Sequence, residues 1–359
     1  MVMLKLLRER ANDYSTNSFI GDFALASKKL GILEAKIDAY QFDHILFPML
    51  HKKEAISSMD IEGTQTTISE VFNNNVNPRP EEQRTMQEVK NHTQAILYGF
   101  DFLRNGKFTH SFIKKLHAIM MSGIVSEKEM QFVGTYKTLD NRITNSAGTV
   151  VFVPPSHSET KKYMDELIDY MNRSDDGVHP LIKAAIIHSQ FESIHPFFDG
   201  NGRVGRLLIS LYLYKSDVIN FPFFYISEAI SADKRVYYNM LTNSRESTYD
   251  GWIKFFLQKI TVQAERHISY IDALNELYKK TKSVVKESIN SPKYDAIIEC
   301  LFMQPVLTAS YFMDELNISR GQAMKYLNIL ESKHVLYGDD RKRGRTFVFV
   351  QLLELARVF

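Results

Sequence analysis

One stretch of the sequence, residues 193–207, combines residues suited to binding a phosphate and moving a proton. It reads S-I-H-P-F-F-D-G-N-G-R-V-G-R-L, and the apolar run 207–214 that follows predicts a buried helix. The glycines would then lie at the N-terminus of that helix, where free backbone N–H groups and the helix dipole favour an anion. Because glycine has no Cβ, a phosphate can approach this backbone closely. The stretch therefore predicts a phosphate-binding loop.

Four side chains of the same stretch add further chemistry. Arg203 and Arg206 lie three residues apart on one helical face and can donate to phosphate oxygens. Asp199 is a hard oxygen ligand of the kind that binds Mg²⁺ carried by phosphates, and His195 can accept a proton near neutral pH. Together they predict a nucleotide polyphosphate held against a general base. The alternative, solvated arginines and a core histidine around a glycine-rich loop, is less consistent with so dense a constellation.

The stretch resembles the signature of the Fic family, H-x-F-x-(D/E)-G-N-G-R-x-x-R. Every fixed position is filled, by His195, Phe197, Asp199, Gly200, Asn201, Gly202, Arg203 and Arg206. Fic proteins are mostly adenylyltransferases that move AMP from ATP to a hydroxyl group of another protein. The resemblance implies ATP and Mg²⁺ as ligands, with His195 as the catalytic base, Asp199 on the metal, and the triphosphate on the glycine loop and both arginines. The alternatives are a Fic-type transferase of phosphate or phosphocholine, a nucleotide-sensing DNA-binding regulator, or an assembly module with a spent site.

A short helical run, 51–63, ends in Glu62 and Gly63. Gly63 suits the position after a helix end, whereas a carboxylate there opposes the helix dipole unless a cation lies opposite. Ser58-x-x-x-Glu62-Gly63 is similar to the inhibitory motif of Fic proteins, (S/T)-x-x-x-E-(G/N). In those proteins the glutamate pairs with the second signature arginine, here Arg206. Alone, the pattern also fits a solvated glutamate; beside a full signature, it implies autoinhibition. Glutamate-bearing relatives also remove AMP, and the sequence leaves the net direction open.

Two β-leaning stretches flank the turn signal Asn145-Ser146-Ala147-Gly148 and predict a hairpin. An isolated hairpin in a helical chain is a candidate docking edge, because its outer backbone groups are unpaired. The resemblance implies that it is the Fic flap, which aligns the target side chain by main-chain pairing. The residues implied to face nucleotide and target are Thr149, Val150, Val151, Phe152 and Val153.

Five further positions follow from the resemblance. Gly134 and Lys137 occupy the place of the family's G-x-(F/Y)-R motif, where lysine lacks the fork of donors that arginine has. Tyr237 and Tyr238 resemble the adenine-side wall, and Arg245 falls where a polar residue approaches the nucleotide. Plain packing is the alternative for these three. Three histidines without partners at metal spacing are interpreted as structural: His92, His110 and His117.

Composition limits the class of protein. The 359 residues exceed one compact core and predict two or three domains, while 44% hydrophobic and 24% charged residues are typical of a soluble globular protein. The single cysteine, Cys300, excludes a disulfide framework and a cysteine-based zinc site. The charged start of the chain and the lack of a long apolar run predict a cytoplasmic protein without membrane contact.

Apolar spacing predicts a mostly α-helical protein: a Fic-type helical bundle with a β-hairpin flap, followed by a small winged-helix (α+β) domain. Pro48 and the loop 73–80 are expected to interrupt the helices. Predicted helices cover 4–11, about 26–47, 81–103, 109–121, 159–172, 180–192 and 261–289. The predicted domains are an N-terminal region 1–80 with an inhibitory helix at about 51–63, a Fic core 81–260, a connecting helix 261–290, and a winged helix 291–359.

The C-terminal pattern predicts a helix at 294–303, a helix–turn–helix with Ser319 as N-cap, and a hairpin of 335–337 and 346–350 that completes it. Residues 319–345 hold more bases than acids, which favours contact with the phosphate backbone of DNA. Protein docking or a homodimer, with solvated charges, is the alternative. The bases are Arg320, Lys325, Lys333, Arg341, Lys342, Arg343 and Arg345; the acids are Glu331, Asp339 and Asp340.

Overall fold

The computed structural model of the chain describes residues 4–39, 43–144, 148–174, 176–341 and 343–359. It divides into two compact units. Unit 1 comprises Met1–Glu34, Ser57–Thr64 and Gln87–Glu265, and unit 2 comprises Ala35–Ile56, Gln65–Met86 and Arg266–Phe359. Each unit gathers segments from more than one predicted domain, and the predicted domain limits stay a prediction.

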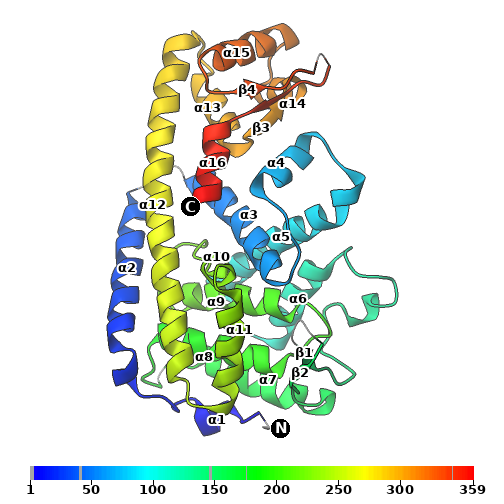
Figure 1. Cartoon of the computed structure of the whole chain (residues 1–359), viewed down its shortest axis with the longest axis vertical. Coiled ribbons are helices and arrows are strands. Elements are labelled where there is room, and N and C mark those ends of the chain that lie inside the picture. The colour runs from blue at the N-terminus through cyan, green and yellow to red at the C-terminus, as the bar shows by residue number, and fades with distance from the viewer. Residues whose placement is uncertain (1–3, 40–42, 145–147, 175, 342) are drawn as a thin grey trace. The chain divides into compact units, whose positions relative to one another are not determined.

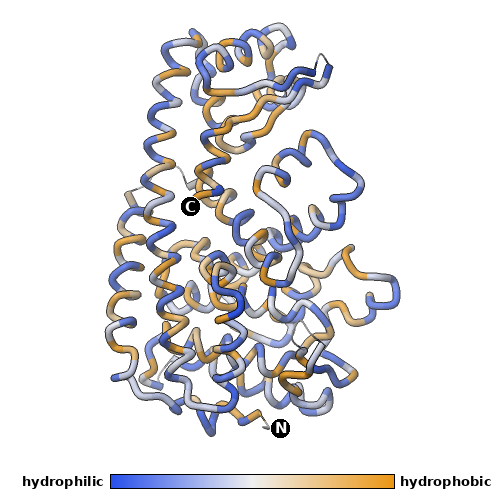
Figure 2. Tube along the Cα trace, in the orientation of Figure 1, coloured by the Kyte–Doolittle hydropathy of each residue, from blue (hydrophilic) through white to orange (hydrophobic). Residues whose placement is uncertain are grey.

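Unit 1 is helical apart from one hairpin, which confirms the expected fold class (Figure 1). Apolar and polar residues alternate along helices such as α12, as expected for helices that bury one face (Figure 2). Its elements are α1 (Leu7–Arg10), η1 (Thr16–Ser18), most of α2 (Ile20–Asp38), the end of α3 (Asp43–Ile61), α5 (Gln83–Asn105), α6 (His110–Met121), η3 (Met130–Phe132), α7 (His157–Asn172), α8 (Pro180–Ile194), α9 (Asn201–Lys215), α10 (Ser227–Ser231), α11 (Lys234–Glu246) and the start of α12 (Asp250–Ser288).

Helix α8 forms the centre of unit 1. Every residue from Leu181 to Ile194 is buried, so this helix is apolar around most of its circumference and packs against both α7 and α9. The indole of Trp252 is also buried and donates a hydrogen bond of 2.7 Å to the carbonyl of Ala185. The segment that joins α8 to α9 is therefore held between two fixed helix ends.

The predicted hairpin is confirmed. Strand β1 (Ile143–Thr144) pairs antiparallel with β2 (Val150–Phe152), with Ile143 opposite Phe152. Three of the predicted turn residues, Asn145, Ser146 and Ala147, lie outside the described residues. Gly148 follows them with a φ of 76°, a left-handed conformation that favours glycine.

Unit 2 contains the predicted helix–turn–helix and wing. Helix α13 (Tyr294–Met303) precedes α14 (Ala309–Leu316) and α15 (Arg320–Ser332), and the Ser319 hydroxyl caps α15 by accepting from the N–H of Gln322. The wing is a three-stranded antiparallel sheet in the order β3-β5-β4. Its strands are β3 (Val306–Thr308), β4 (Tyr337–Gly338) and β5 (Thr346–Val348).

Three elements of unit 2 were not predicted. Strand β3 is too short for a periodicity signal, and α16 (Val350–Val358) begins where the second wing strand was expected to continue. Helix α4 (Ile68–Val76) occupies the first part of the predicted loop 73–80. The rest of that loop leads into the short turn η2 (Pro80–Glu82). A capping box of Thr67 and Glu70 opens α4, and this sequence signal was available.

Three predicted helix limits are wrong. The predicted helix 26–47 corresponds to parts of two helices, α2, which ends at Asp38, and α3, which begins at Asp43. Pro48 lies inside α3 instead of interrupting it; its missing N–H removes one internal hydrogen bond, and the rest of the helix is retained. Helix α12 runs unbroken from Asp250 to Ser288, across the expected limit at 261, because no proline stands in that span. None of the described helices combines the length and the apolar character needed to cross a bilayer.

Candidate active site

The glycine loop that was predicted to bind phosphate joins α8 to the start of α9. Helix α8 ends at His195, whose backbone is left-handed (φ 48°, ψ 61°), and α9 begins at Asn201 directly after Gly200. Gly200 has a φ of 76°, and a Cβ built on it would approach the sulfur of Met121 to 2.9 Å. Because its N-cap is a glycine, α9 begins without a side-chain cap, and its first N–H groups suit an anion.

Two asparagines hold the loop from inside. The Asn201 amide accepts from the N–H of Phe197 at 2.8 Å and donates to the Phe197 carbonyl at 2.9 Å. Asn141 donates to the carbonyls of His195 and Phe197, both at 3.1 Å. Since the Asn201 side chain is used within the loop, any contact of this residue with phosphate falls to its backbone. No sequence signal pointed to Asn141.

Lys137 supports the same loop. It is buried, its ammonium donates to the Ile194 carbonyl at 3.2 Å and to Asn141 at 2.8 Å, and its N–H donates to the Pro196 carbonyl. Burial lowers the pKa of Lys137 to about 8, with Asp140 acting in the opposite direction. This lysine stabilises the carbonyl end of α8, where a cation is favourable.

His117 is structural, as predicted. Its Nδ1 accepts from the N–H of Gly134 at 2.9 Å, so Nε2 carries the proton and donates to the Asp199 carbonyl at 3.0 Å. The ring also stacks on Phe197 with centroids 3.9 Å apart. Burial lowers its pKa to about 4, which keeps the ring neutral in this role. Gly134 thus serves the loop through its backbone.

His195 is neutral at physiological pH. Burial lowers its pKa to about 4, the charges of Lys137 and Arg245 lower it further, and the Glu192 carbonyl and Glu62 act against the shift. An imidazole with a low pKa is unprotonated at pH 7 and available to accept a proton. The charge of Glu62 acts on His195, and Glu62 Oε1 lies at Gly202 in the first turn of α9, so the imidazole lies near this helix end.

The predicted pairing of Glu62 with Arg206 is present. Arg206 donates to Glu62 Oε1 at 2.7 Å, to the Ser58 hydroxyl at 3.0 Å and to the Ser58 carbonyl at 2.8 Å. Arg206 is only 1% exposed, and Glu62 holds its pKa above the ordinary value despite burial. Burial favours the protonated form of Glu62, but Arg206 and Arg203 outweigh it, so the pKa of Glu62 is lowered and the carboxylate is charged.

Glu62 lies at the first turn of α9. A Cβ built on Gly202 would overlap Glu62 Oε1 and lie 2.8 Å from Arg206 Nη1, so only glycine admits this carboxylate here. The segment Ser58–Gly63, predicted to be inhibitory and called the inhibitory segment below, is held by the hydroxyl of Tyr238, which donates to the Ile61 carbonyl at 3.2 Å. Gly63 ends it with a φ of 97°, as expected after a helix. A protein carboxylate thus sits at the anion-binding helix end.

Asp199 lies at the open side of the loop, beside Arg203, whose side chain is only 11% exposed. The Asp199 side chain is 69% exposed, its Oδ1 accepts from the Gly200 N–H at 2.6 Å, and its Oδ2 lies 3.7 Å from Arg203. No group of three His, Cys, Asp or Glu residues able to hold a metal occurs in the described part of the chain. One exposed carboxylate oxygen fits Mg²⁺ that takes most of its ligands from phosphates and water.

The hairpin reaches the same region through Phe152. The Arg245 guanidinium lies 4.4 Å from the centroid of the Phe152 ring and donates to the Ser193 hydroxyl at 3.1 Å. Burial lowers the pKa of Arg245 to about 10, which leaves it charged. Of the five hairpin candidates, Phe152 is buried and Val153 is half-buried, whereas Thr149, Val150 and Val151 are exposed. The structure therefore joins Arg245 and Phe152 but leaves the outer edge of the hairpin open.

Tyr237 and Tyr238, the residues predicted to line the adenine side, differ in burial. Tyr237 is buried, and its hydroxyl forms a 2.8 Å hydrogen bond with His188 Nε2 while its ring packs near Trp252. Tyr238 is 42% exposed and contacts the inhibitory segment. Tyr237 is thus a core residue in this structure, and a nucleotide contact for either ring stays a prediction. Sequence reasoning also missed Glu192, a buried carboxylate whose only signal is a charge within an apolar helix.

Comparison with known sequences identifies the family. The Fic/DOC family profile matches residues 107–213, and the profile of the Fic/DOC family N-terminal region matches residues 21–101. Together these segments make up more than half of the chain. The chain belongs to the Fic/DOC family, which confirms the resemblance inferred from the signature.

Two relatives carry names that state an activity. The probable protein adenylyltransferase aq_aa38 of Aquifex aeolicus is 23% identical over 263 residues, which are 66% of this chain and 75% of the relative. Protein adenylyltransferase Fic of Nematostella vectensis is 31% identical over 111 residues, only 28% of this chain and 26% of the relative.

Solved structures share the fold. A Fic family protein from Desulfovibrio desulfuricans G20 superimposes with a TM-score of 0.60 at 20% identity, over 94% of this chain and 97% of that one. A Fic domain containing signaling protein from Bacteroides thetaiotaomicron gives a TM-score of 0.53 at 22% identity, over 68% of this chain and 95% of that one.

Proposed function

We propose that this protein is a protein adenylyltransferase, which transfers AMP from ATP to a Ser, Thr or Tyr hydroxyl of a target protein. The observation that supports the proposal is the neutral His195 at the start of the loop 195–200, which leads into the uncapped N-terminus of α9. A proton acceptor near a helix N-terminus suits transfer from a bound phosphate. The names of the Aquifex and Nematostella relatives support the same activity.

The chain's own residues suffice to describe the transfer. The N–H groups at the start of α9 and the guanidinium groups of Arg203 and Arg206 bind the triphosphate. His195 removes the proton from the target hydroxyl, whose oxygen forms a bond to the α-phosphorus while the bond to the β-phosphate oxygen breaks and pyrophosphate leaves. Asp199 would hold Mg²⁺, which supplies charge neutralisation to the phosphates when it is bound. Positioning and charge stabilisation dominate such a reaction.

We further propose that Ser58, Glu62 and Gly63 form an autoinhibitory motif. Glu62 occupies the start of α9 with one carboxylate oxygen and engages Arg206, which then has fewer donors for the outer phosphates. ATP bound beside Glu62 would have its α-phosphorus displaced, and a misplacement of about 1 Å costs on the order of a hundredfold in rate. Removal of AMP from modified targets is a second reaction of the same site in this proposal, with Glu62 activating a water.

The exposed edge of the hairpin is the proposed docking site of the target. Val150 and Val151 are each 39% exposed, and among the strands that the structure describes β2 pairs with β1 alone, so its other edge can pair with an extended target segment. Phe152 connects this edge to Arg245 and Ser193 at the site.

Mass spectrometry of modified proteins tests the activity. Incubating the Glu62→Gly variant with ATP, Mg²⁺ and cell lysate is expected to yield proteins carrying the added mass of AMP on a hydroxyl side chain. The His195→Ala/Glu62→Gly double variant is the control that defines background. Adducts of phosphate or phosphocholine mass would identify a different Fic-type transferase, and the absence of any adduct on proteins or on the enzyme itself would contradict the proposal.

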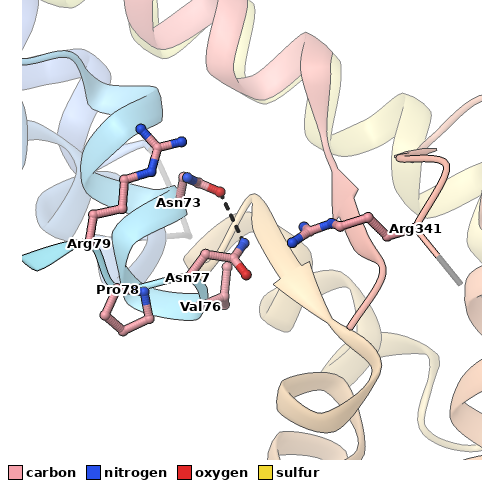
Figure 3. Close-up of a pocket in the computed structure, with 6 residues that line it drawn as sticks. All are labelled: Asn73, Val76, Asn77, Pro78, Arg79 and Arg341. Atoms are coloured by element: carbon pink, nitrogen blue, oxygen red, sulfur yellow. Dashed lines mark hydrogen bonds between the residues drawn. The ribbon is translucent and has the colours of Figure 1, made fainter. Parts of the chain in front are cut away.

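A second candidate function, binding of a DNA backbone, is favoured by a basic hollow in unit 2. A cavity of about 500 Å³ is lined by Arg320, Arg341, Arg343, Arg345 and the start of α14, among other residues. An adjoining hollow of about 490 Å³ shares Arg341 and adds Arg79. The Arg341 guanidinium is directed toward Asn77 there (Figure 3).

The charges of this hollow are only partly neutralised. Arg345 pairs with Glu331 at 2.7 Å and Arg341 with Asp339 at 2.6 Å, whereas Arg320 and Arg343 form no ion pair with a described residue. Lys342, counted among the predicted bases, lies outside the described residues. Two free guanidinium groups beside a helix N-terminus suit phosphate groups. A homodimer through this unit remains the alternative outcome.

The salt dependence of DNA binding tests whether the hollow binds a DNA backbone or forms a homodimer contact. A labelled duplex is expected to bind the full chain with an affinity that falls as salt rises, and Arg320→Ala/Arg343→Ala should flatten the slope by about one to two phosphate contacts. Arg357→Ala, which removes an exposed charge of α16 outside the hollow, is the matched control. Equal slopes for the three proteins would contradict the assignment, and a change of mass in light scattering would identify the homodimer instead.

A further inference from the structure

A second carboxylate is buried near Arg206. Glu192 of α8 is 7% exposed, and its Oε1 forms no hydrogen bond with any described residue. Arg206 is a buried cation, and its hydrogen bonds within the described chain go to Ser58 and Glu62 of the inhibitory segment. A buried carboxylate oxygen without a partner is costly, so its place beside a buried arginine requires an explanation.

Two glycines of α9 make room for two acids. A Cβ built on Gly205 would overlap Glu192 Oε1 and lie 3.0 Å from the Phe191 ring, just as one built on Gly202 would overlap Glu62 Oε1. Gly205 and Arg206 follow Gly202 by three and four positions, so each of them is a neighbour of Gly202 on the helix surface. This part of the helix surface therefore presents one guanidinium group and two gaps, and each gap is filled by a carboxylate from a different element.

The charges of the two acids depend on each other. Burial raises the pKa of Glu192 to about 7; Arg206 and Arg245 act to lower it, and Glu62 acts to raise it. These charged groups belong to α9, α11 and the inhibitory segment. When Glu62 leaves, the charge that opposes ionisation of Glu192 leaves with it. Glu192 can then become the counter-ion of Arg206.

We propose that Glu192 is a positioning residue that keeps Arg206 at the phosphate site whenever Glu62 is displaced, and that Gly205 provides the space for this contact. Without Glu192, the release of Glu62 would leave a buried cation with no acidic partner, and Arg206 would leave its position. The contact between Glu192 and Arg206 does not depend on the proposed function. The role of that contact in binding the outer phosphates of ATP rests on it.

Thermal unfolding tests the contact without any catalytic assay. Glu62→Gln and Glu192→Gln keep the shape of each side chain, and each single variant should change Tm by little, because the other acid still pairs with Arg206. The double variant should lose roughly 5 °C or more beyond the sum of the singles. Additive losses, or a Glu192→Gln loss as large as that of the double variant, would overturn the proposal even if the protein has another activity.

Steady-state kinetics in the Glu62→Gly background test the positioning role. Glu192→Gln should raise the KM for ATP about tenfold, the worth of one charged hydrogen bond, and change kcat less. Gly205→Ala should reproduce this effect by displacing the carboxylate, and should have no further effect in a Glu192→Ala variant. Gly251→Ala is the matched control, because a Cβ on that helical glycine meets nothing within 4 Å. An unchanged KM in Glu192→Gln or Gly205→Ala would overturn the role.

Discussion

Replacing His195 with alanine is expected to lower AMP transfer by about 10²- to 10⁴-fold while ATP still binds. In the proposed mechanism this side chain is the neutral proton acceptor, whereas the N–H groups of α9 and the two arginines bind ATP without it. The measurement is auto-modification with labelled ATP in the Glu62→Gly background, together with calorimetric titration of ATP. Transfer at the undiminished rate would show that another group is the base.

Backbone strain must be separated from the loss of the base. His195 has a φ of 48°, and His334 of unit 2, with a φ of 57°, offers a matched control for placing alanine in a left-handed position. His195→Asn adds a variant that accepts this backbone conformation but is no base. We expect His334→Ala to retain transfer, and His195→Asn to be as inactive as His195→Ala.

The pH profile gives the same assignment a second readout. Burial lowers the pKa of His195 to about 4 from an ordinary value of 6.5, so the neutral ring is present above the lowered pKa and is lost as pH falls through it. Transfer should therefore stay level from about pH 8 down to about pH 6 and fall only in more acidic solution. Half-loss near pH 6.5 would indicate a solvated histidine or a different base.

Replacing Glu62 with glycine is expected to raise auto-modification on the order of a hundredfold. The variant removes the carboxylate from the start of α9 and frees the Arg206 donor that binds it at 2.7 Å. The outer phosphates can then take this position, which aligns the α-phosphorus with His195. Initial rates with labelled ATP and Mg²⁺ measure the change.

Glu246→Gly is the control for this variant, because it also places glycine at a helix end of unit 1 but removes an exposed carboxylate. Its rate should match that of the unaltered protein. The rate of Glu62→Gln should fall between those of the unaltered protein and Glu62→Gly, since the amide keeps a hydrogen bond to Arg206 but loses the charge. A Glu62→Gly rate equal to that of the unaltered protein would refute autoinhibition by Glu62.

Much of the site could be predicted because its chemistry is local. His195, Asp199 and Arg203 lie within a few residues of each other, and the glycines that begin α9 are recognised by their spacing. Helical periodicity likewise predicted α5 and α6 within two residues at each end. The inhibitory pattern was visible as a short motif, although alone it fits any solvated glutamate.

The sequence by itself determined the family signature, the helical class and the turn at Gly63, because these depend on neighbours in the chain. The pairing of Glu62 with Arg206 across 144 residues was implied by the family resemblance, and the tertiary structure contains it. Only the tertiary structure decided that Asn201 turns its side chain inward and that Glu192 is buried beside the site. Periodicity indicates which face of a helix is apolar, but it does not specify the distant element that packs there. Contacts between distant side chains follow from that packing.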